Sequence, residues 1–257
     1  MSTLRARAQR LPPLIPYLGM RALSAAALPP ALAHHVRNRH RYRSLPGAER
    51  LRLADSFPKL ADRLPTTPYD PHYLHQDTWA AQRVSEHGPD RHVDVGSRVD
   101  YVCFLTSLTA VSFVDIRPLD VQIEGLTSVE GSVLAMPFED GSLESVSCLH
   151  VAEHIGLGRY GDPLDPQGSV KAMAELQRVL APGGRLLFSL PVGRPRVCFD
   201  AHRIHAPQDV IDRFAELELV EFAGVDDEKV FARHRRPDEL SAASYACGMF
   251  HFRRPDS

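Results

Sequence analysis

From about residue 90 onward, short runs of β-forming residues alternate with segments of helical length, and this alternation constrains the fold more than any other feature. Such an order is typical of a mostly parallel β-sheet flanked by helices. The last two runs are expected to form an antiparallel pair. We therefore predict an α/β protein with seven strands, near residues 92–96, 110–116, 126–131, 142–150, 185–193, 218–227 and 245–254.

Helices are predicted between these strands. The clearest is the segment 168–184, in which apolar residues recur at helical spacing before a Pro-Gly-Gly turn that is expected to end the helix. Two further helices are expected at residues 100–108 and 206–217.

Residues 1–89 do not share this alternation, and they contain many prolines and arginines. We predict that they form a helical arm or cap, and that residues 90–257 form the catalytic domain. Open α/β sheets bind ligands at the carboxyl ends of their strands, so the cap is expected to lie over that edge. Trp79 either closes over a ligand or anchors the cap in the core. It belongs to a dense aromatic and polar group, which comprises Tyr73, His75, Gln76, Asp77 and Trp79.

Charge is distributed unevenly along the chain, although the net charge is only −2. Residues 1–52 contain ten arginines and a single acid, so the rest of the chain has an excess of acidic residues. An acidic body argues against a nucleic-acid partner, whose footprint is a basic face. We expect the charged side chains of the arginine-rich arm to be solvated and the arm to dock on the rest of the protein. The alternative is that the arm binds an anionic membrane surface or an acidic protein.

The four cysteines are widely spaced and contain no C-x-x-C pair, a pattern that predicts neither a disulfide framework nor a thiolate metal site. No run of about 18 apolar residues is present, so no membrane span is predicted. Residues 11–33 come nearest to a signal peptide, but Arg21 and several prolines interrupt their apolar run. We expect a cytoplasmic protein.

Two long motifs are the most specific part of the sequence. They are VEGSVLAMPFEDGSLESVSCLHVAEHI at residues 129–155 and AMAELQRVLAPGGRLLFSLPV at residues 172–192. In this order they resemble class I S-adenosylmethionine-dependent methyltransferases over roughly residues 90–253. The strings HYLHQDTW, EHIGLGRYGDPLDP and FDAHR are similar to an uncharacterised bacterial branch known as a domain of unknown function. The resemblance implies a Rossmann-like methyltransferase sheet, mostly parallel with an antiparallel last strand, and S-adenosylmethionine as cofactor.

The resemblance also implies a cofactor site around the turn after the first strand. Gly96 would make the turn, Ser97 would offer its hydroxyl to the carboxylate or ribose of the cofactor, and Asp94 would steer the ammonium group or orient the loop. Asp115 follows Gly96 by about 20 residues, the spacing at which an acid accepts hydrogen bonds from both ribose hydroxyls; capping of the next turn is the alternative. The remaining contacts, around the adenine ring, are predicted for Ile116, Ser132 and Val133.

The segment HVAEHIG places His150, Glu153 and His154 at positions i, i+3 and i+4. On a helical turn these side chains would share one face beside the transferable methyl group. We predict His154 as the general base, oriented by Glu153 or His150, with His202 as another candidate base. A purely structural role is one alternative, and a metal-binding facial triad is another; no metal is expected.

The segment 156–166 is rich in turn-forming residues and is predicted to be a substrate loop, or else a plain surface connection. Carboxylates accept hydrogen bonds from sugar hydroxyls, and a tyrosine ring can stack on a pyranose. The segment FDAHRIH after the fifth strand adds further polar side chains to this edge. The predicted substrate contacts are Arg159, Tyr160, Asp162 and Arg203.

These predictions favour methyl transfer to an oxygen of a small-molecule or glycan acceptor, such as a sugar, a glycan precursor in polysaccharide biosynthesis or a sugar-bearing natural product. The alternative is a noncatalytic protein that uses the same fold for cofactor sensing or scaffolding, and Ser97, Arg98 and Ser132 favour it because they replace residues typical of the family. A nicotinamide-dependent oxidoreductase is disfavoured by the missing glycines and by the MPFEDGS run.

Overall fold

The computed structural model describes residues 30–60 and 62–256, and the chain divides into two compact units, residues 1–68 and 69–257. In the first unit residues 30–43 are helical, and the described residues that follow contain turns and extended segments. Arg39 Nη2 donates a hydrogen bond to the Leu51 carbonyl at 3.0 Å within this unit. The part of the predicted arm before residue 30 lies outside the described residues, so its membrane or protein contact stays a prediction.

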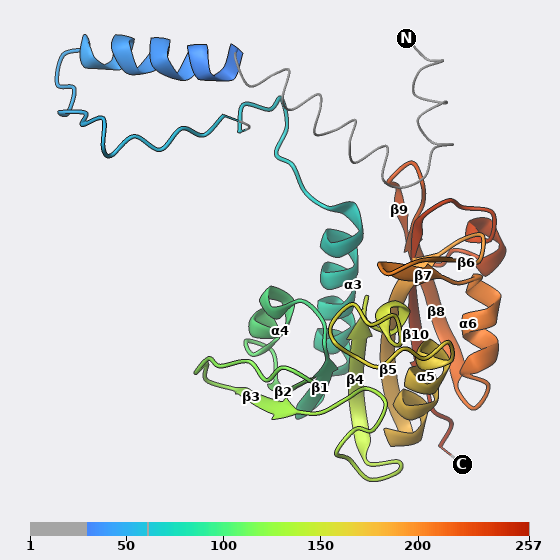
Figure 1. Ribbon diagram of the computed structural model, residues 1–257. Helices are drawn as coiled ribbons and strands as arrows, with labels where there is room; N and C mark the ends of the chain where they lie inside the picture. The colour runs from blue at the N-terminus through green and yellow to red at the C-terminus, as the bar shows by residue number, and fades with distance from the viewer. Residues whose placement is uncertain (1–29, 61, 257) are drawn as a thin grey trace. The chain divides into compact units, whose positions relative to one another are not determined.

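The second unit is built on an eight-stranded sheet with the order β3-β2-β1-β4-β5-β10-β8-β9 (Figure 1). Strands β1 to β5 pair in parallel, whereas β10 is antiparallel to both of its neighbours. All seven predicted strands are present, and the short β9 adds an eighth at the edge. The strands are β1 (Arg91–Val95), β2 (Ala110–Asp115), β3 (Leu126–Glu130), β4 (Leu143–Leu149), β5 (Leu180–Val192), β8 (Glu218–Val225), β9 (Phe231–Ala232) and β10 (Ala246–Arg253).

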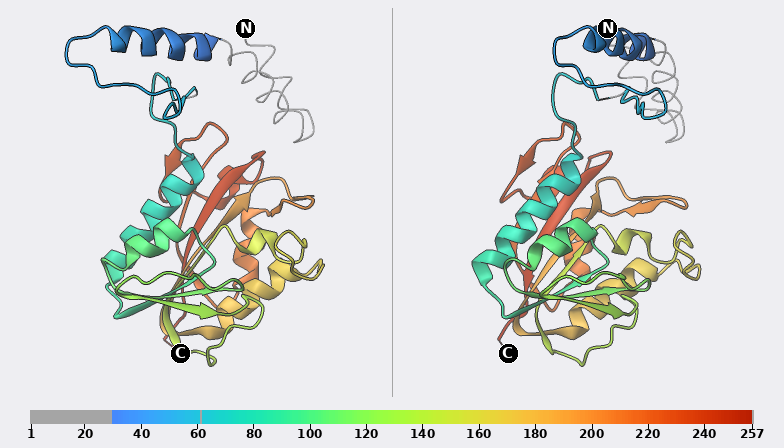
Figure 2. Two further views of the ribbon diagram at one scale, coloured as in Figure 1. Left: turned by 60° about the vertical axis from the view of Figure 1, so that its left-hand side comes forward. Right: turned by 90° about the vertical axis from the view of Figure 1, so that its left-hand side faces the viewer.

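Helices cover both faces of this sheet (Figures 1 and 2). Helices α3 (Pro71–His87) and α4 (Val99–Leu105) lie on one face, and α5 (Gly168–Val179) and α6 (Pro207–Arg213) lie on the other. Each face has its own cluster of buried apolar side chains. A parallel sheet that is buried on both sides needs such runs of apolar strand residues, and this explains the pattern seen in the sequence.

Helix α3 belongs to the second unit, so the boundary between the units lies at residue 68 and not at residue 89 as predicted. Asp70 caps the helix by accepting from the backbone amides of its first turn, and Gly88 ends it in the left-handed conformation at φ +62°. Trp79 is only 1% exposed and packs in the core cluster on this face of the sheet. Trp79 therefore anchors α3 to the sheet, which is the second of the two predicted roles.

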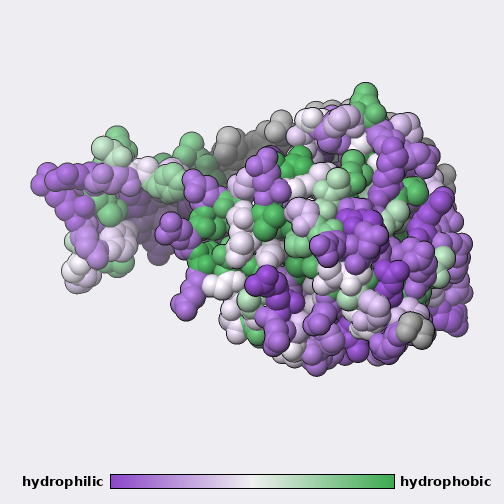
Figure 3. Space-filling model, turned by 90° about the horizontal axis from the view of Figure 1, so that it is seen from below, coloured by the Kyte–Doolittle hydropathy of each residue, from purple (hydrophilic) through white to green (hydrophobic). Residues whose placement is uncertain are grey.

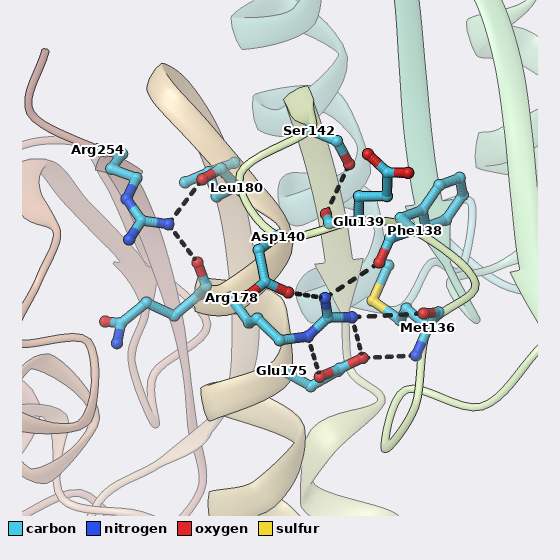
Figure 4. Close-up of polar contacts among 10 residues, drawn as sticks. Met136, Phe138, Glu139, Asp140, Ser142, Glu175, Arg178, Leu180 and Arg254 are labelled. Atoms are coloured by element: carbon cyan, nitrogen blue, oxygen red, sulfur yellow. Dashed lines mark hydrogen bonds and ion pairs between the residues drawn. The ribbon is translucent and has the colours of Figure 1, made fainter.

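Arg178 joins the two motifs that carry the family resemblance (Figure 4). Its Nε and Nη2 donate to the Glu175 carboxylate at 2.8 and 2.7 Å, and Nη1 donates to the Phe138 carbonyl at 3.1 Å. Nη1 also pairs with Asp140, and Glu175 accepts from the Met136 amide at 2.6 Å. Hence the end of α5 holds the MPFEDGS segment in place ahead of β4.

Helix α5 ends at Val179, earlier than predicted, and β5 begins at the next residue. Leu180 already pairs with Leu143 of β4, so the helix ends before the Pro-Gly-Gly turn. A further difference is a small hairpin of β6 (Arg196–Cys198) and β7 (His202–Ile204), antiparallel to each other, in a segment where no strand was predicted.

The face of the molecule seen in Figure 3 is predominantly hydrophilic, and polar side chains separate small groups of apolar residues. The two large apolar clusters lie inside the second unit, on either side of the sheet. Within the part of the chain that the structure describes, no helix combines the length and the apolar character that a membrane span requires.

Candidate active site

A pocket opens at the edge of the sheet where β1, β2 and β4 end. Parallel strands end at a common edge, so turns that are distant in sequence converge there, as in the ligand sites of open α/β sheets. Nine of the predicted site residues line this pocket: Gly96, Asp115, Ile116, Ser132, Val133, His150, His154, Tyr160 and Asp162.

Gly96 forms the tight turn after β1. Its φ is +67°, a conformation that favours glycine. A Cβ at this position would lie 3.3 Å from Cγ1 of Val151, and the backbone amide donates to the Val114 carbonyl at 2.9 Å. A single glycine therefore suffices to close this turn against β2 and to keep the pocket wall free of a side chain.

Asp94 and Ser97 are buried and do not line the pocket, so the cofactor contacts predicted for them do not match the structure. Asp94 Oδ1 accepts from the Ser97 amide at 3.0 Å, and Oδ2 accepts from the Ser147 hydroxyl. Ser97 Oγ accepts from the Leu149 amide at 3.0 Å. Burial raises the pKa of Asp94 to about 7, against the lowering effect of its hydrogen bonds. Both side chains orient the turn, which was the alternative for Asp94.

Asp115 ends β2, and its carboxylate lines the pocket. Oδ1 accepts from the Arg117 amide at 2.7 Å, so one oxygen caps the following turn. The other oxygen, Oδ2, lies beside Gly96, 3.7 Å from the position that a Cβ would take there. Ile116 is exposed next to this carboxylate and also lines the pocket. The capping role and a ligand-binding role are therefore compatible, because they use different oxygens.

The turn after β3 supplies an apolar wall. A Cβ on Gly131 would lie 3.0 Å from Val114 Cγ1 and 3.1 Å from Pro137 Cδ, so the turn packs tightly against β2. Ser132 Oγ accepts from the Leu134 amide at 3.1 Å, and this bond stabilises the turn itself. Val133 is buried beside it and lines the pocket together with Ser132.

His150, Glu153 and His154 do not share the face of one helical turn, and that prediction was wrong. The His150 amide donates to the Ser189 carbonyl at 2.9 Å, which keeps this residue tied to β5 with a positive φ of 56°. Only Ala152–His154 then form a 3-10 helix, η1. As a result both histidines line the pocket, whereas Glu153 is fully buried behind it.

His154 is held in one tautomer. Its Nδ1 lies 2.6 Å from the carbonyl oxygen of Ala201, and because a carbonyl can only accept, Nδ1 carries the proton. Burial lowers the pKa of His154 to about 4, against the raising effect of that hydrogen bond. The imidazole is therefore neutral at pH 7, with an unprotonated Nε2 3.6 Å from Glu153 Oε1.

His150 is held in the same way by α3. Its Nδ1 lies 2.6 Å from Oε1 of Gln76, whose amide nitrogen donates to Asp77 at 3.1 Å and whose orientation is thereby set. Ser189 Oγ also donates to Gln76 Oε1, at 2.6 Å. Burial lowers the pKa of His150 to about 3. Its Nε2 is buried and has no hydrogen-bond partner among the described residues.

The Glu153 carboxyl is 0% exposed, and neither oxygen has a hydrogen-bond partner in the described part of the chain. Burial raises its pKa to about 8, with the Arg159 charge opposing the shift. This carboxyl is therefore protonated at pH 7. A neutral acid can pack behind His154, but it cannot stabilise an imidazolium as an ionised carboxylate would, which limits the orienting role predicted for it.

The predicted substrate loop lies against the pocket. The Tyr160 ring packs edge-on against His154, with centroids 5.7 Å apart, and the guanidinium carbons of Arg117 and Arg159 lie 4.9 and 5.1 Å from its centroid. Asp162 accepts from the Gly156 amide at 2.6 Å and from the Tyr160 amide at 3.3 Å, and it lines the pocket. The loop thus presents the Tyr160 ring to the pocket. The Asp162 carboxylate stabilises the loop backbone that carries this ring.

Arg203 does not reach the pocket, in contrast to the substrate contact predicted for it. Its guanidinium is buried and donates to the carbonyls of Ile155 and Asp165 at 2.6 and 3.1 Å, so it ties the loop to β7. His202 and Arg159 likewise do not line the pocket, although His202 is close enough for its charge to lower the pKa of His150 and His154 further.

Sequence reasoning missed several residues of this site. Apolar Val151 and Ile155, which flank the short helix η1 on either side, line the pocket among the predicted polar positions. The contact of α3 with His150 was also missed: the Tyr73 ring lies 5.3 Å from the His150 ring, and the His72 ring lies 6.0 Å from it. The density of aromatic and polar residues in 72–79 was the available signal. The remaining unpredicted lining residues are Val95, Val114, Arg117, Gly131 and Leu134.

A family model described as "Caenorhabditis protein of unknown function, DUF268" matches residues 110–239, about half of the 257 residues. That description names a nematode genus, so the bacterial branch expected from the sequence stays a prediction. No curated protein matches this chain.

Several solved structures have a similar fold. N-methyltransferase NodS from Bradyrhizobium japonicum WM9, in complex with S-adenosyl-L-homocysteine, is 18% identical with a TM-score of 0.50, over 79% of this chain and 94% of that one. A putative sarcosine dimethylglycine methyltransferase from Galdieria sulphuraria is 15% identical with a TM-score of 0.51, over 71% and 86%. A putative methyltransferase from Bacillus halodurans C-125 is 16% identical with a TM-score of 0.50, over 70% and 98%. The second unit therefore has the Rossmann-like fold of class I methyltransferases.

Proposed function

This chain belongs to the family described as "Caenorhabditis protein of unknown function, DUF268", and from its methyltransferase fold and its pocket we propose that it is an S-adenosylmethionine-dependent methyltransferase. One observation carries the proposal. The same pocket contains a carboxylate beside a glycine turn and, after β4, a neutral histidine with an unprotonated ring nitrogen. The first can bind a nucleoside, and the second can accept a proton from an acceptor.

The residues of the pocket fit S-adenosylmethionine. Asp115 would accept hydrogen bonds from the ribose hydroxyls through Oδ2, the oxygen that does not cap its own turn. Ile116 and Val133 would contact the adenine ring. The turn at Gly96 leaves room for the amino-acid tail, and since this ligand has no phosphate, the further glycines of dinucleotide-binding turns are not needed.

The bound cofactor would supply a methyl group on a positively charged sulfur, which makes it electrophilic. The protein would contribute two things: it would position the acceptor oxygen in line with the bond between the methyl group and the sulfur, and it would remove the proton of the acceptor. His154 fits the second task, because its Nδ1–H donates to the Ala201 carbonyl and its Nε2 is therefore unprotonated. A positioned base of this kind contributes roughly 10²–10⁴-fold to the rate.

We further propose that the acceptor is a hydroxyl of a sugar, a glycan precursor or another polyhydroxylated compound. The support is the aromatic ring of Tyr160 beside His154, because such a ring can stack on the apolar face of a pyranose while the histidine accepts from a hydroxyl. This proposal would place the protein in polysaccharide or natural-product biosynthesis.

The test has two stages. Isothermal titration with S-adenosylmethionine and with NADH should show binding of the first and not of the second. Nucleotide sugars and glycan fragments are then incubated with the protein and S-adenosylmethionine, and mass spectrometry should show the gain of one methyl group. A folded protein that binds neither S-adenosylmethionine nor NADH would contradict the enzymatic proposal and favour the noncatalytic alternative.

A further inference from the structure

Three potential metal ligands meet beside the pocket, at the same edge of the sheet. His72 comes from the first turn of α3, His150 follows β4, and Cys247 lies at the start of β10. One ligand atom of each side chain lies within 4.8 Å of the other two. The antiparallel direction of β10 brings Cys247 to this edge, opposite Pro191 near the end of β5.

His150 is oriented as a metal ligand would be. Metal-binding histidines commonly donate their second ring nitrogen to a neighbouring oxygen, which fixes the tautomer and the ring position. Here Nδ1 donates to Gln76 Oε1 at 2.6 Å, and the opposite nitrogen, Nε2, is buried without a hydrogen-bond partner among the described residues. His150 is only 8% exposed, so an unpaired nitrogen at this position needs an explanation.

His72 and Cys247 complete a confined site. The His72 ring stacks on Tyr245, with centroids 5.1 Å apart, and Asp70 accepts from the His72 backbone amide at 2.9 Å, so both ring and backbone are supported. Cys247 is completely buried and is not in a disulfide. A buried thiol beside two imidazoles forms a nitrogen and sulfur donor set.

We propose that His72, His150 and Cys247 bind a zinc ion. Two imidazoles and one thiolate suit Zn²⁺, which prefers nitrogen and sulfur ligands in tetrahedral geometry. Zn–N bonds of about 2.0–2.1 Å and Zn–S bonds of about 2.3 Å imply ligand separations of roughly 3.3–3.8 Å, so the three atoms would have to close by about 1 Å. The thiol proton passes to solvent as the Zn–S bond forms.

Three protein ligands leave the fourth tetrahedral position open, as in catalytic zinc sites and in contrast to closed structural ones. His150 also lines the methyltransferase pocket, so this open position is adjacent to the space where an acceptor would bind. The proposal of a zinc site does not depend on methyl transfer, because binding of the metal alone can be measured without cofactor or acceptor.

The full-length protein is stripped with a chelator and titrated with Zn²⁺ alone, in competition with a coloured zinc indicator. We expect one tightly bound equivalent. Substitution of Co²⁺ should give a thiolate-to-metal charge-transfer absorption band, because the ligand set contains a cysteine. Absence of tight binding, or a Co²⁺ spectrum without this band, would overturn the proposal.

Matched variants identify the ligands. Cys247→Ala should remove the Co²⁺ band and weaken Zn²⁺ binding by at least about 10–100-fold, the range seen when even supporting residues of metal sites are lost. Cys148→Ala is the control, since Cys148 is equally buried but lies in the core cluster on the other face of the sheet. Equal binding by both variants would show that zinc is held elsewhere, for example by other histidines.

Cys247→Ala changes a completely buried residue and can impair folding, so a second pair of variants tests a less buried ligand. His72→Asn changes a half-buried helix position and should weaken Zn²⁺ binding to a similar extent, while circular dichroism shows an intact fold. His75→Asn changes a histidine of the same helix, which stacks on Phe231 and is not part of the cluster, and should bind zinc as the unmodified protein does. Loss of binding in both, or in neither, would contradict the assignment of His72.

Discussion

Gln76 Oε1 accepts a hydrogen bond of 2.6 Å from His150 Nδ1, although the two residues lie 74 positions apart in the chain. The same oxygen accepts from Ser189 Oγ at 2.6 Å, so one helix residue joins the ends of β4 and β5. All three side chains are buried. Helix α3 is therefore part of the site as well as a cover for the sheet, because it decides which nitrogen of His150 carries the proton.

Gln76→Leu should disturb both stability and the histidine. It removes the acceptor that His150 Nδ1 and Ser189 Oγ share. The two groups lie 3.3 Å apart and then have only each other, so one donor is left unsatisfied, which costs about 1–3 kcal/mol in the free energy of unfolding. Urea unfolding measures this loss, and ¹⁵N NMR of the imidazole should show a mixture of tautomers. Gln82→Leu, at an exposed position of the same helix, is the control. A single Nδ1–H tautomer in Gln76→Leu would show that the bond does not orient the ring.

Asp115→Ala should weaken the binding of S-adenosylmethionine. Hydrogen bonds to a charged group contribute about 1.5–3 kcal/mol each, so the loss of one or two of them corresponds to at least about tenfold in Kd. Isothermal titration measures the change, and Asp120→Ala, in the exposed loop that follows, should bind normally. Unchanged affinity in Asp115→Ala would place the nucleoside elsewhere.

His154→Asn should separate binding from turnover. The variant removes the accepting nitrogen but leaves Asp115 and Gly96 in place, so the Kd for S-adenosylmethionine is expected to stay the same. The kcat for methyl transfer should fall by roughly 10²–10⁴-fold, the contribution of a positioned base. His234→Asn, at an exposed site on another loop, is the comparison. Equal loss of binding and turnover would assign His154 a structural role instead.

Glu153 should make the protein less stable as the pH rises. Its pKa is raised from 4.5 to about 8 in the folded state, so between these pH values the folded state binds more protons than the unfolded state does. The free energy of unfolding therefore decreases with increasing pH across this window. Glu153→Gln removes the ionisable group and should be more stable than the unmodified protein at pH 9, by an amount on the order of a few kcal/mol.

Urea unfolding at pH 5 and at pH 9 measures this difference. Glu144→Gln, at an exposed position of β4, should change the stability little at either pH. A Glu153→Gln variant with the same pH dependence as the unmodified protein would show that the carboxyl is not held neutral in the fold.

Arg178→Met should destabilise the fold without touching the pocket. It removes the donor that holds Glu175, Asp140 and the Phe138 carbonyl, and it leaves the partly buried Glu175 carboxylate with the Met136 amide alone. We expect a loss of about 1–3 kcal/mol in the free energy of unfolding, reduced by the partial exposure of the arginine. Arg213→Met, on the exposed side of α6, is the matched control for thermal and urea unfolding. A loss equal to that of the control would mean that the network contributes no net stability.

Local patterns in the amino-acid sequence were sufficient to predict the sheet and the position of the pocket. Strand periodicity and the Pro-Gly-Gly turn are short-range signals, and the carboxyl ends of parallel strands meet at one edge in any such fold. The family resemblance and the spacing of about 20 residues predicted Gly96 and Asp115 at that edge, and each lies directly at a strand end.

Long-range packing decides which polar side chains face the pocket. It also decides which of them are buried and hydrogen-bonded within the protein. The amide of His150 pairs with β5, which prevents the expected helical turn, and Glu153 is buried. The guanidinium of Arg203 donates its hydrogen bonds to loop carbonyls and so does not reach the pocket. His72, His150 and Cys247 converge although their spacing in the chain predicts no metal site. Such outcomes follow from register and backbone dihedral angles that neighbouring strands impose, and no local pattern contains these interactions.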